Sequence, residues 1–302
     1  METAVPDSTT APVALTGFSR WLNSWWPSAR LRRDPLSELR VAGRYATVSI
    51  ANWKLTPRMS RWLLERRVAQ PLTFSQDQRL TVVIPFRDRE EHLRQLMPVL
   101  SATLDEQGID YRVLVVEQEA GGLFNRGKLI NVGIHHAAGA SDYYCLHDVD
   151  AVPVVANYQC PSQPLRLVNT IRGPEGETRR TDYYFSGAVS IRREQAFAAN
   201  GYSNEYWGWG KEDDDFFFRL LLAGYLCFYD TQGTYDDLPN PKQQQVVRKS
   251  PQTPPHVKHN RDRRSRLLRG LSSPHEDGLN TLRYEVIEQS GGARFERIRV
   301  RW

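Results

Sequence analysis

Residues 80–117 read LTVVIPFRDREEHLRQLMPVLSATLDEQGIDYRVLVVE, and this stretch decides the fold class. Leu80–Pro85 is a short, continuous apolar run, which is typical of a strand buried on both faces. Leucines at helical spacing follow within Arg89–Leu104, and Arg112–Glu117 is a second apolar run. Strand, helix and strand in this order predict a βαβ unit and hence an α/β fold with parallel strands.

The alternation continues downstream. Lys128–Ala138 suits a second crossover helix, and Asp142–Leu146 suits a third strand. In open parallel sheets, ligands bind at the carboxyl ends of the strands. The residues that fall at these ends are Arg87, Glu117 and Asp148. We therefore expect the functional site at that edge of the sheet.

The composition indicates a soluble globular protein. The 302 residues are 40% apolar and 25% charged, enough for one large core or two ordinary ones. No apolar run approaches the roughly 18 residues that span a bilayer, and no secretory signal pattern is present. The three cysteines, Cys145, Cys160 and Cys227, form no CxxC pair, which excludes a zinc ribbon or finger.

The net charge of +5 is unevenly distributed. Arg20–Arg67 holds eleven basic and three acidic residues, and Arg248–Arg269 holds eight basic and one acidic. The rest of the chain is therefore acidic. Solvated surface is one interpretation of the basic segments, and contact with an anionic ligand or membrane surface is the other.

Three regions are expected along the chain. Residues 1–12 lack any apolar period and form a disordered tail. Residues 13–75 are basic and aromatic, and an aromatic helical face between Phe18 and Trp26 is compatible with membrane contact through residues 18–33, or with packing on the body or a partner. Residues 76–302 form the main domain.

Two motifs have the composition of a metal site. Asp148 and Asp150 follow a strand on a tight loop, where they suit a hard divalent cation or simply cap a turn. His256 and His259 are three residues apart in the basic segment and can face one ion if that segment turns or is helical. Surface histidines without a ligand are the alternative.

The most distinctive stretch is YWGWGKEDDDF at residues 206–216. Trp209 offers a flat face to a sugar ring, and one of the four consecutive acids could act as a general base. The alternative is a helix N-terminus with the acids on the helix dipole and the tryptophans in the core. Upstream, Arg126 could address a phosphate or nucleobase, while Asn125 suits a helix N-cap.

Taken in order, seven motifs resemble the β-1,4-galactosyltransferases, inverting enzymes that move galactose from UDP-galactose onto a sugar acceptor. These motifs are IPFRDREEHL, FNRGKLINVG, HDVD, YFSGAVSI, YWGWGKEDDD, HVKHNRD and EDGLNTLRYEV. The resemblance runs from about Leu80 to Val286. The resemblance implies a GT-A fold, with a mixed, mostly parallel sheet flanked by helices, and residues 76–302 as the catalytic domain.

The resemblance also implies roles for individual residues. Asp213 would be the general base and Glu212 a contact of the donor sugar in the catalytic centre. Asp150, His259 and His256 would bind Mn²⁺, with Mg²⁺ as an alternative, and the histidines would lie on a mobile loop at about residues 250–272. The donor site would comprise Pro85, Phe86, Arg87, Arg89, Phe124, Arg126, Asp148, Tyr184, Gly187 and Trp209. The acceptor site would comprise Asp214, Trp209 and Tyr184.

Other features leave alternatives open. Lys211 stands where many members have glycine and the xylose-acting subgroup has arginine, whereas Cys145 and Cys160 resemble a disulfide region of the N-acetylglucosamine-acting members. Transfer from another UDP-sugar such as UDP-GalNAc, and a sugar-binding protein without turnover, are the alternative functions. We expect no binding of nucleic acid. We expect a cytoplasmic location, with peripheral membrane contact as an option.

Overall fold

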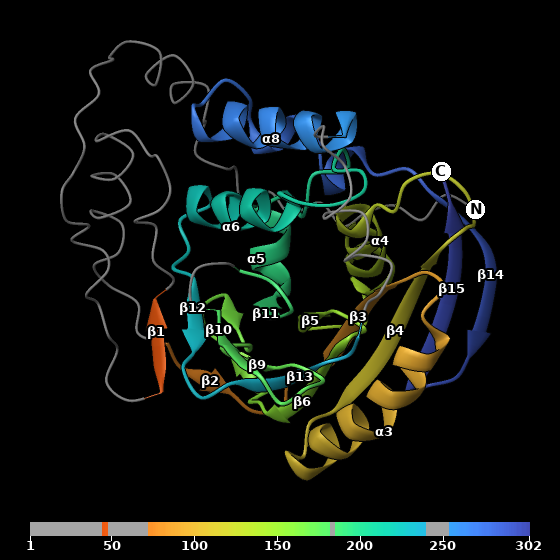
Figure 1. Ribbon diagram of the computed structural model, residues 1–302, viewed down its shortest axis with the longest axis vertical. Helices are drawn as coiled ribbons and strands as arrows, with labels where there is room; N and C mark the ends of the chain where they lie inside the picture. The colour runs from red at the N-terminus through yellow and green to blue at the C-terminus, as the bar shows by residue number, and fades with distance from the viewer. Residues whose placement is uncertain (1–43, 48–71, 182–184, 240–253) are drawn as a thin grey trace.

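A mixed sheet forms the centre of the fold in the computed structural model, which describes residues 44–47, 72–181, 185–239 and 254–302 (Figure 1). Within these residues the sheet has nine strands, which in spatial order are β1 (Tyr45–Thr47), β12 (Phe228–Asp230), β8 (Leu165–Arg166), β11 (Ala188–Arg192), β5 (Tyr143–His147), β3 (Leu80–Phe86), β4 (Tyr111–Gln118), β15 (Phe295–Arg301) and β14 (Glu285–Gly291). Strands β5, β3, β4 and β15 run parallel, while β11 is antiparallel to both of its neighbours. The prediction of a mixed, largely parallel sheet is confirmed.

Two smaller sheets complete the strands of the described residues. One contains β10 (Thr178–Arg180), β9 (Thr170–Arg172), β13 (Thr234–Asp237) and β6 (Ala151–Val155), and the other pairs β2 (Phe74–Ser75) with β7 (Cys160–Pro161). Because β1 and β2 pair with strands of the body, the body includes short segments that precede the boundary expected at residue 76. The expected tail at residues 1–12 and the segment at residues 18–33 lie outside the described residues.

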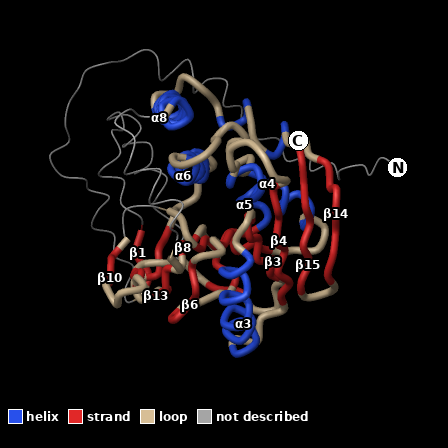
Figure 2. Tube along the Cα trace, turned by 45° about the vertical axis from the view of Figure 1, so that its right-hand side comes forward, coloured by secondary structure: helices blue, strands red, loops and turns tan. Residues whose placement is uncertain are grey.

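Helices cover both faces of the central sheet. These are α3 (Glu90–Glu106), α4 (Arg126–Ala137), α5 (Arg193–Ala198), α6 (Glu212–Leu222) and α8 (Pro255–Leu268), followed by 3₁₀ turns at Pro274–Glu276 and Leu279–Thr281. Figure 2 shows α3 on one side of the sheet and α4, α5 and α6 on the other, with α8 stacked beyond α6. The predicted crossover helices and strands all form, with ends within two residues of those expected.

The two-sided covering explains the continuous apolar runs. Side chains alternate along a strand, so Val83 and Leu114 join the core under α4, whereas Val82 and Val113 join the core under α3. The predicted leucine face of α3 is buried in this second core, through Leu93, Leu96, Leu100 and Leu104. On the other face, Gly133 lets α4 lie close to β3, because a Cβ there would be 2.3 Å from Cγ1 of Val83.

All three cysteines are buried, and none of them, each within the described residues, takes part in a disulfide. Cys145 and Cys160 therefore act as small buried side chains, one of the two options that the sequence left open. Burial raises the pKa of the Cys160 thiol to about 11. Among the described residues no helix is both long and apolar enough to cross a membrane.

Candidate active site

Arg126 joins two carboxylates that come from different parts of the chain. Its Nε donates to Asp148 Oδ1 at 2.7 Å, and its Nη1 donates to Asp213 Oδ1 at 2.6 Å. Its side chain is only 12% exposed, so these charge-assisted bonds form in a largely desolvated place. The HDVD motif at the end of β5 and the acidic run of α6 are thereby held in one site.

The N-terminus of α4 positions this arginine. Asn125 is the N-cap, because its Oδ1 accepts from the backbone N–H of Lys128 at 2.9 Å. The backbone N–H of Asn125 donates to Gln118 Oε1 at 2.8 Å, and its side-chain amide donates to the carbonyl of Asn204 at 2.7 Å. The cap interpretation of Asn125 is confirmed, and these bonds fix the first turn from which Arg126 extends.

Burial dominates the electrostatics of the HDVD loop. It raises the pKa of both Asp148 and Asp150; Arg126 opposes this at Asp148, and the negative charge of Asp237 adds to it at Asp150. Asp237 lies there because β13 pairs with β6 in a register that places it opposite Ala151. The loop therefore brings together carboxyl groups whose simultaneous ionisation is unfavourable.

This donor set fits a hard divalent cation. Oxygen ligands suit Mn²⁺ or Mg²⁺, and a cation would remove the cost of ionising adjacent buried carboxylates. The expected ligand group is nevertheless incomplete, because no three acidic, histidine or cysteine side chains of the described residues are grouped closely enough to hold a metal. Asp150 ends the HDVD loop, and the roles of His256 and His259 as further ligands stay a prediction.

The histidines lie on α8. This helix begins at Pro255, so the condition that the segment be helical is met, and the helix packs against α6 (Figure 1). His259 is exposed, and the ring of His256 packs against Gly208 in the YWGWG motif. Within the segment predicted as a mobile loop, at about residues 250–272, residues 255–268 form a regular helix, and residues 250–253 lie outside the described residues.

The four consecutive acids begin α6 and take different partners. Burial and the charge of Asp213 raise the pKa of Glu212 to about 8. Burial also raises the pKa of Asp213, which the positive charge of Arg126 and a hydrogen bond from Ser186 lower in turn. Glu212 and Asp213 therefore belong to the Arg126 site, and both are biased toward holding a proton.

The other two acids point elsewhere. Asp214 Oδ2 is 3.0 Å from Lys211 Nζ and 2.9 Å from Arg264 Nε, which ties α6 to α8. Asp215 is buried with Arg219, whose Nε donates to Asp215 Oδ1 at 2.5 Å. Asp215 is therefore part of the packing rather than of the site.

The tryptophans of the motif are not a buried core. Trp209 is 49% exposed, so its indole is accessible to a ligand, and the core interpretation is wrong for this residue. Trp207 packs edge-on against Trp302, with ring centroids 6.0 Å apart. The backbone N–H of Gly208 donates to the carbonyl of Phe124 at 2.8 Å and so anchors the motif beside α4.

Several predicted donor-site residues gather at the carboxyl ends of β3 and β4. The guanidinium of Arg87 lies over the ring of Phe124, 5.2 Å from its centroid. Pro85 and Phe86 are buried at the end of β3, and the charge of Arg89 acts on Asp150. At the start of β11, the carbonyl of Gly187 accepts from the backbone N–H of Asp148 at 2.7 Å. Tyr184 lies outside the described residues.

Sequence reasoning missed several residues of the site. The hydroxyl of Tyr202 donates to Asp213 Oδ1 at 3.3 Å, and its ring lies under Arg126. Ser186 bonds Asp213, and Asp237 adds its charge to Asp150. Ser186 lies within the YFSGAVSI motif but was not singled out, whereas Tyr202 and Asp237 lie outside the quoted motifs and reach the site through packing or strand pairing.

Comparison with known proteins identifies two family regions. Residues 43–161 match the family described as the N-terminal region of glycosyl transferase group 7. Residues 174–235 match the family described as the N-terminal domain of galactosyltransferase. Both regions contribute residues to the Arg126 site.

Curated proteins that are similar to this chain in sequence belong to the same group of enzymes. The chain is 33% identical over 222 residues to β-1,4-galactosyltransferase 1 of Homo sapiens, covering 70% of this chain and 51% of the relative. It is 40% identical over 151 residues to β-1,4-galactosyltransferase 7 of Drosophila melanogaster, covering 48% of this chain and 46% of the relative. The matches thus span about half the length of these relatives.

Solved structures agree with the sequence comparison. The catalytic domain of Drosophila β-1,4-galactosyltransferase 7 in complex with xylobiose superposes with a TM-score of 0.59 and 29% identity, covering 74% of this chain and 93% of that chain. A mutant of that enzyme in complex with manganese, UDP-Gal and xylobiose gives a TM-score of 0.61 at 28% identity, with the same coverage. The GT-A fold that we expected is confirmed, and the chain belongs to the β-1,4-galactosyltransferase family.

Proposed function

We propose that this protein is an inverting galactosyltransferase, which moves galactose from UDP-galactose to a hydroxyl of a sugar acceptor in a β-1,4 linkage. The observation that carries the proposal is the Arg126 bridge between Asp148 and Asp213. Through this bridge, Asp148 of the proposed donor side and Asp213, the proposed base, both bond the same guanidinium. The named relatives and the manganese, UDP-Gal and xylobiose complex support the choice of donor and acceptor class.

Inversion requires a single displacement with a base on the acceptor side. Asp213 takes that role, because burial raises its pKa toward the range in which a general base works best. It accepts the proton of the acceptor hydroxyl while that oxygen attacks the anomeric carbon. Tyr202 and Arg126 hold its carboxylate in place through hydrogen bonds at 3.3 and 2.6 Å.

The residues beside Asp213 orient the two sugars. Glu212, whose pKa is raised to about 8 by burial and by Asp213, is protonated at neutral pH and can donate a hydrogen bond to the donor sugar. Asp214 binds an acceptor hydroxyl while Lys211 and Arg264 hold it from the other side. The exposed indole of Trp209 covers the sugar ring.

On the donor side, Arg87 and Phe124 form a cation and aromatic pair suited to the uridine diphosphate. Asp150 would hold a divalent cation, Mn²⁺ or Mg²⁺, with Asp148 as its neighbour. That cation supplies charge neutralisation of the departing diphosphate. His259 and His256 of α8 would be further ligands only after a shift of this helix.

A donor and acceptor screen with the purified protein and Mn²⁺ tests the proposal. We expect UDP-galactose to be consumed with acceptors that end in xylose or N-acetylglucosamine, and the product to carry a β-anomeric galactose in its NMR spectrum. A product with the α configuration would contradict the inverting mechanism. Transfer from UDP-GalNAc in preference to UDP-galactose would contradict the donor assignment.

A further inference from the structure

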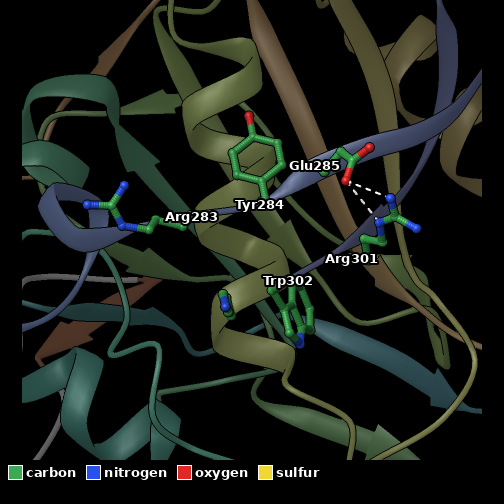
Figure 3. A pocket seen from close by; sticks show the side chains of 6 residues that line it. Arg283, Tyr284, Glu285, Arg301 and Trp302 are labelled. Atoms are coloured by element: carbon green, nitrogen blue, oxygen red, sulfur yellow. Dashed lines mark hydrogen bonds and ion pairs between the residues drawn. The ribbon is translucent and has the colours of Figure 1, made fainter.

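A pocket of about 430 Å³ lies against the first turn of α4, at Lys128, two residues after Arg126 (Figure 3). Its walls come from α4 and from β14 and β15 with the chain next to them. The six lining residues are Lys128, Arg283, Tyr284, Glu285, Arg301 and Trp302. None of these residues has a role in the proposed transfer, although the volume falls in the range of roughly 300–1,000 Å³ that is typical of small-molecule sites.

The pocket has an excess of positive charge. Lys128 and Arg283 form no ion pair with any described side chain, whereas Arg301 is bonded to Glu285 at 2.9 Å. Burial lowers the pKa of Lys128, and the charge of Glu205 partly offsets that effect. Lys128 and Arg283 are therefore available to an anionic ligand, whereas the charge of Arg301 is neutralised by Glu285.

Aromatic rings stand beside these cations. Trp302 is 39% exposed, and the ammonium of Lys128 lies 4.5 Å from its ring centroid. Tyr284 is fixed in place, because its hydroxyl and His135 Nδ1 are 3.0 Å apart. Figure 3 shows Tyr284 and Trp302 along the same side of α4, with Arg283 and Arg301 on either side of them. A flat apolar face next to unpaired cations suits a sugar ring that carries an acidic group.

One lining residue of the pocket, Trp302, contacts the YWGWG motif. Trp302 packs on Trp207, which precedes the Gly208-Trp209 pair of the YWGWG motif. Arg126 and Lys128 are two residues apart in one helical turn and so point in different directions, one to the carboxylates and one to the pocket. The contact between Trp207 and Trp302 therefore joins the pocket to the motif that contains Trp209.

We propose that this pocket binds an anionic sugar unit of the acceptor, one bearing a carboxylate or a phosphate, at a distance from the hydroxyl that receives galactose. The inference rests on the proposed transferase function and specifies its acceptor class as an acidic oligosaccharide. Lys128 and Arg283 bind the acidic group, and Trp302 stacks on the ring.

Binding of single sugar units to the full chain provides the first test. Methyl β-glucuronide, glucose 6-phosphate and uncharged methyl β-glucoside are titrated separately, and the indole N–H signal of Trp302 is followed by NMR. We expect both acidic sugars to bind on the order of tenfold or more tightly than the glucoside, and Arg283→Gln to remove about tenfold of that affinity, as expected for one charge-assisted hydrogen bond. The relative affinity of the two acidic sugars distinguishes carboxylate from phosphate recognition.

The matched control is Arg294→Gln, because Arg294 is also an exposed arginine of this region of the sequence but pairs with Asp105 and does not line the pocket. Its affinity for the acidic sugars should equal that of the parent protein. Equal binding of all three sugars, or equal loss in both variants, overturns the proposal. Binding of inorganic phosphate as tight as that of glucose 6-phosphate overturns the sugar part of it.

Transfer kinetics provide the second test and separate the two proposals. Xylobiose is compared with the same disaccharide extended by a glucuronosyl residue. We expect the charged acceptor to have the lower KM, and Arg283→Gln to abolish that advantage with kcat unchanged. Failure of all transfer, with acidic sugars still bound at Trp302, contradicts the transferase function alone, whereas transfer with equal KM values contradicts only the subsite.

Discussion

At the scale of single residues, the site depends on the different partners that bond the neighbouring carboxylates of α6. Glu212 and Asp213 are adjacent, yet only Asp213 bonds Arg126, and Asp214 faces Lys211 and Arg264. Consecutive residues at a helix start point in different directions, so each acid meets a different partner. One residue can therefore take a proton while the next positions a sugar.

The substitution Asp213→Asn tests the assignment of the base. The amide retains the shape of the carboxylate but cannot accept the proton, so kcat should fall by a factor on the order of 10² to 10⁴, with the affinity for UDP-galactose nearly unchanged. Asp214→Asn is the matched variant and should raise the KM for the acceptor more than it changes donor binding. Near-normal turnover in Asp213→Asn would make Glu212 the better candidate.

Glu212 predicts a pH dependence of stability. Its pKa of about 8, raised by burial and by Asp213, lies above the value of about 4.3 that a glutamate has in an unfolded chain. Between these pH values the folded protein holds a proton that the unfolded chain has released, so this contribution is present at low pH and is lost as the pH rises toward 8. Glu212→Gln cannot release the proton, and its melting temperature should fall less than that of the parent between about pH 5 and pH 8.5. Identical falls in the two proteins would argue against the raised pKa.

At the scale of elements, the pairing of α6 with α8 organises the acceptor side of the site. Arg264 of α8 reaches Asp214, and Asn260 donates to the carbonyl of Trp207 at 3.1 Å. Arg263 bonds Asp277, which in turn accepts from the backbone N–H of Asn204 at 2.6 Å. The YWGWG motif is thus held between α4 and α8.

Gly208 tests the contact between this motif and α8. Its φ is +74°, and a Cβ there would lie 2.6 Å from Cδ2 of His256, so Gly208→Ala should strain the backbone and displace the ring of His256. Gly210 also has a positive φ, of +101°, but a Cβ there would meet no atom within 4 Å, which makes Gly210→Ala the control. Both variants should lose about 1–3 kcal/mol of unfolding free energy from backbone strain, and the excess loss in Gly208→Ala measures the clash. The double variant Gly208→Ala, His256→Ala should lose no more unfolding free energy than Gly210→Ala. That result would show that the excess loss in Gly208→Ala comes from the contact with His256.

Arg219 tests the packing of α6. Its side chain is 2% exposed, and besides Asp215 it donates to the carbonyls of Pro274 and Asp277 at 2.9 and 2.7 Å. Arg219→Ala leaves the buried carboxylate of Asp215 without its ion-pair partner, although Tyr206 still donates to it, so the unfolding free energy should fall by about 3–5 kcal/mol. Arg94, which pairs with Glu91 on the surface of α3 and is 72% exposed, is the control. Arg94→Ala should cost at most about 1 kcal/mol in the same denaturant titration.

At the scale of the whole molecule, the fold brings acids from three distant segments toward one edge of the sheet. Asp150 follows β5, Asp237 ends β13, and Asp213 lies in the first turn of α6. Burial raises the pKa of all three, and the charge of Asp237 raises the pKa of Asp150 further, so ionising Asp150 beside Asp237 is unfavourable without a bound cation. Metal binding should therefore stabilise the whole fold.

Thermal unfolding with and without Mn²⁺ measures this coupling. At a concentration of 100 times its Kd, a ligand that binds only the folded state adds about 2.7 kcal/mol of stability. We expect Mn²⁺ to raise the melting temperature, a chelator to reverse the rise, and Asp150→Asn to abolish it. The rise should also be larger at pH 7.5 than at about pH 5, because protonated carboxylates bind metal poorly. A full rise in Asp150→Asn would place the metal elsewhere.

The sequence by itself determined the elements and their order. Apolar runs of strand length and leucines at helical spacing are local patterns, and they predicted β3, α3, β4, α4 and β5 because burial on a given face requires that spacing. The N-cap of α4 could also be predicted from the sequence, because the side chain of Asn125 accepts from the backbone N–H of Lys128, only three residues away. The family motifs likewise lie in continuous stretches of the chain.

Only the tertiary structure decided which side chains act together. Arg126 meets Asp148 and Asp213 at separations of 22 and 87 residues, and Asp237 reaches Asp150 through strand register. The acidic run looked uniform in the sequence, yet packing buried Asp215 with Arg219 and left Trp209 exposed. The sequence left open whether the segment of His256 and His259 is a turn or a helix, and the structure makes it α8, which packs against α6. Pairing, burial and pKa depend on contacts between distant segments, and local sequence carries no record of those contacts.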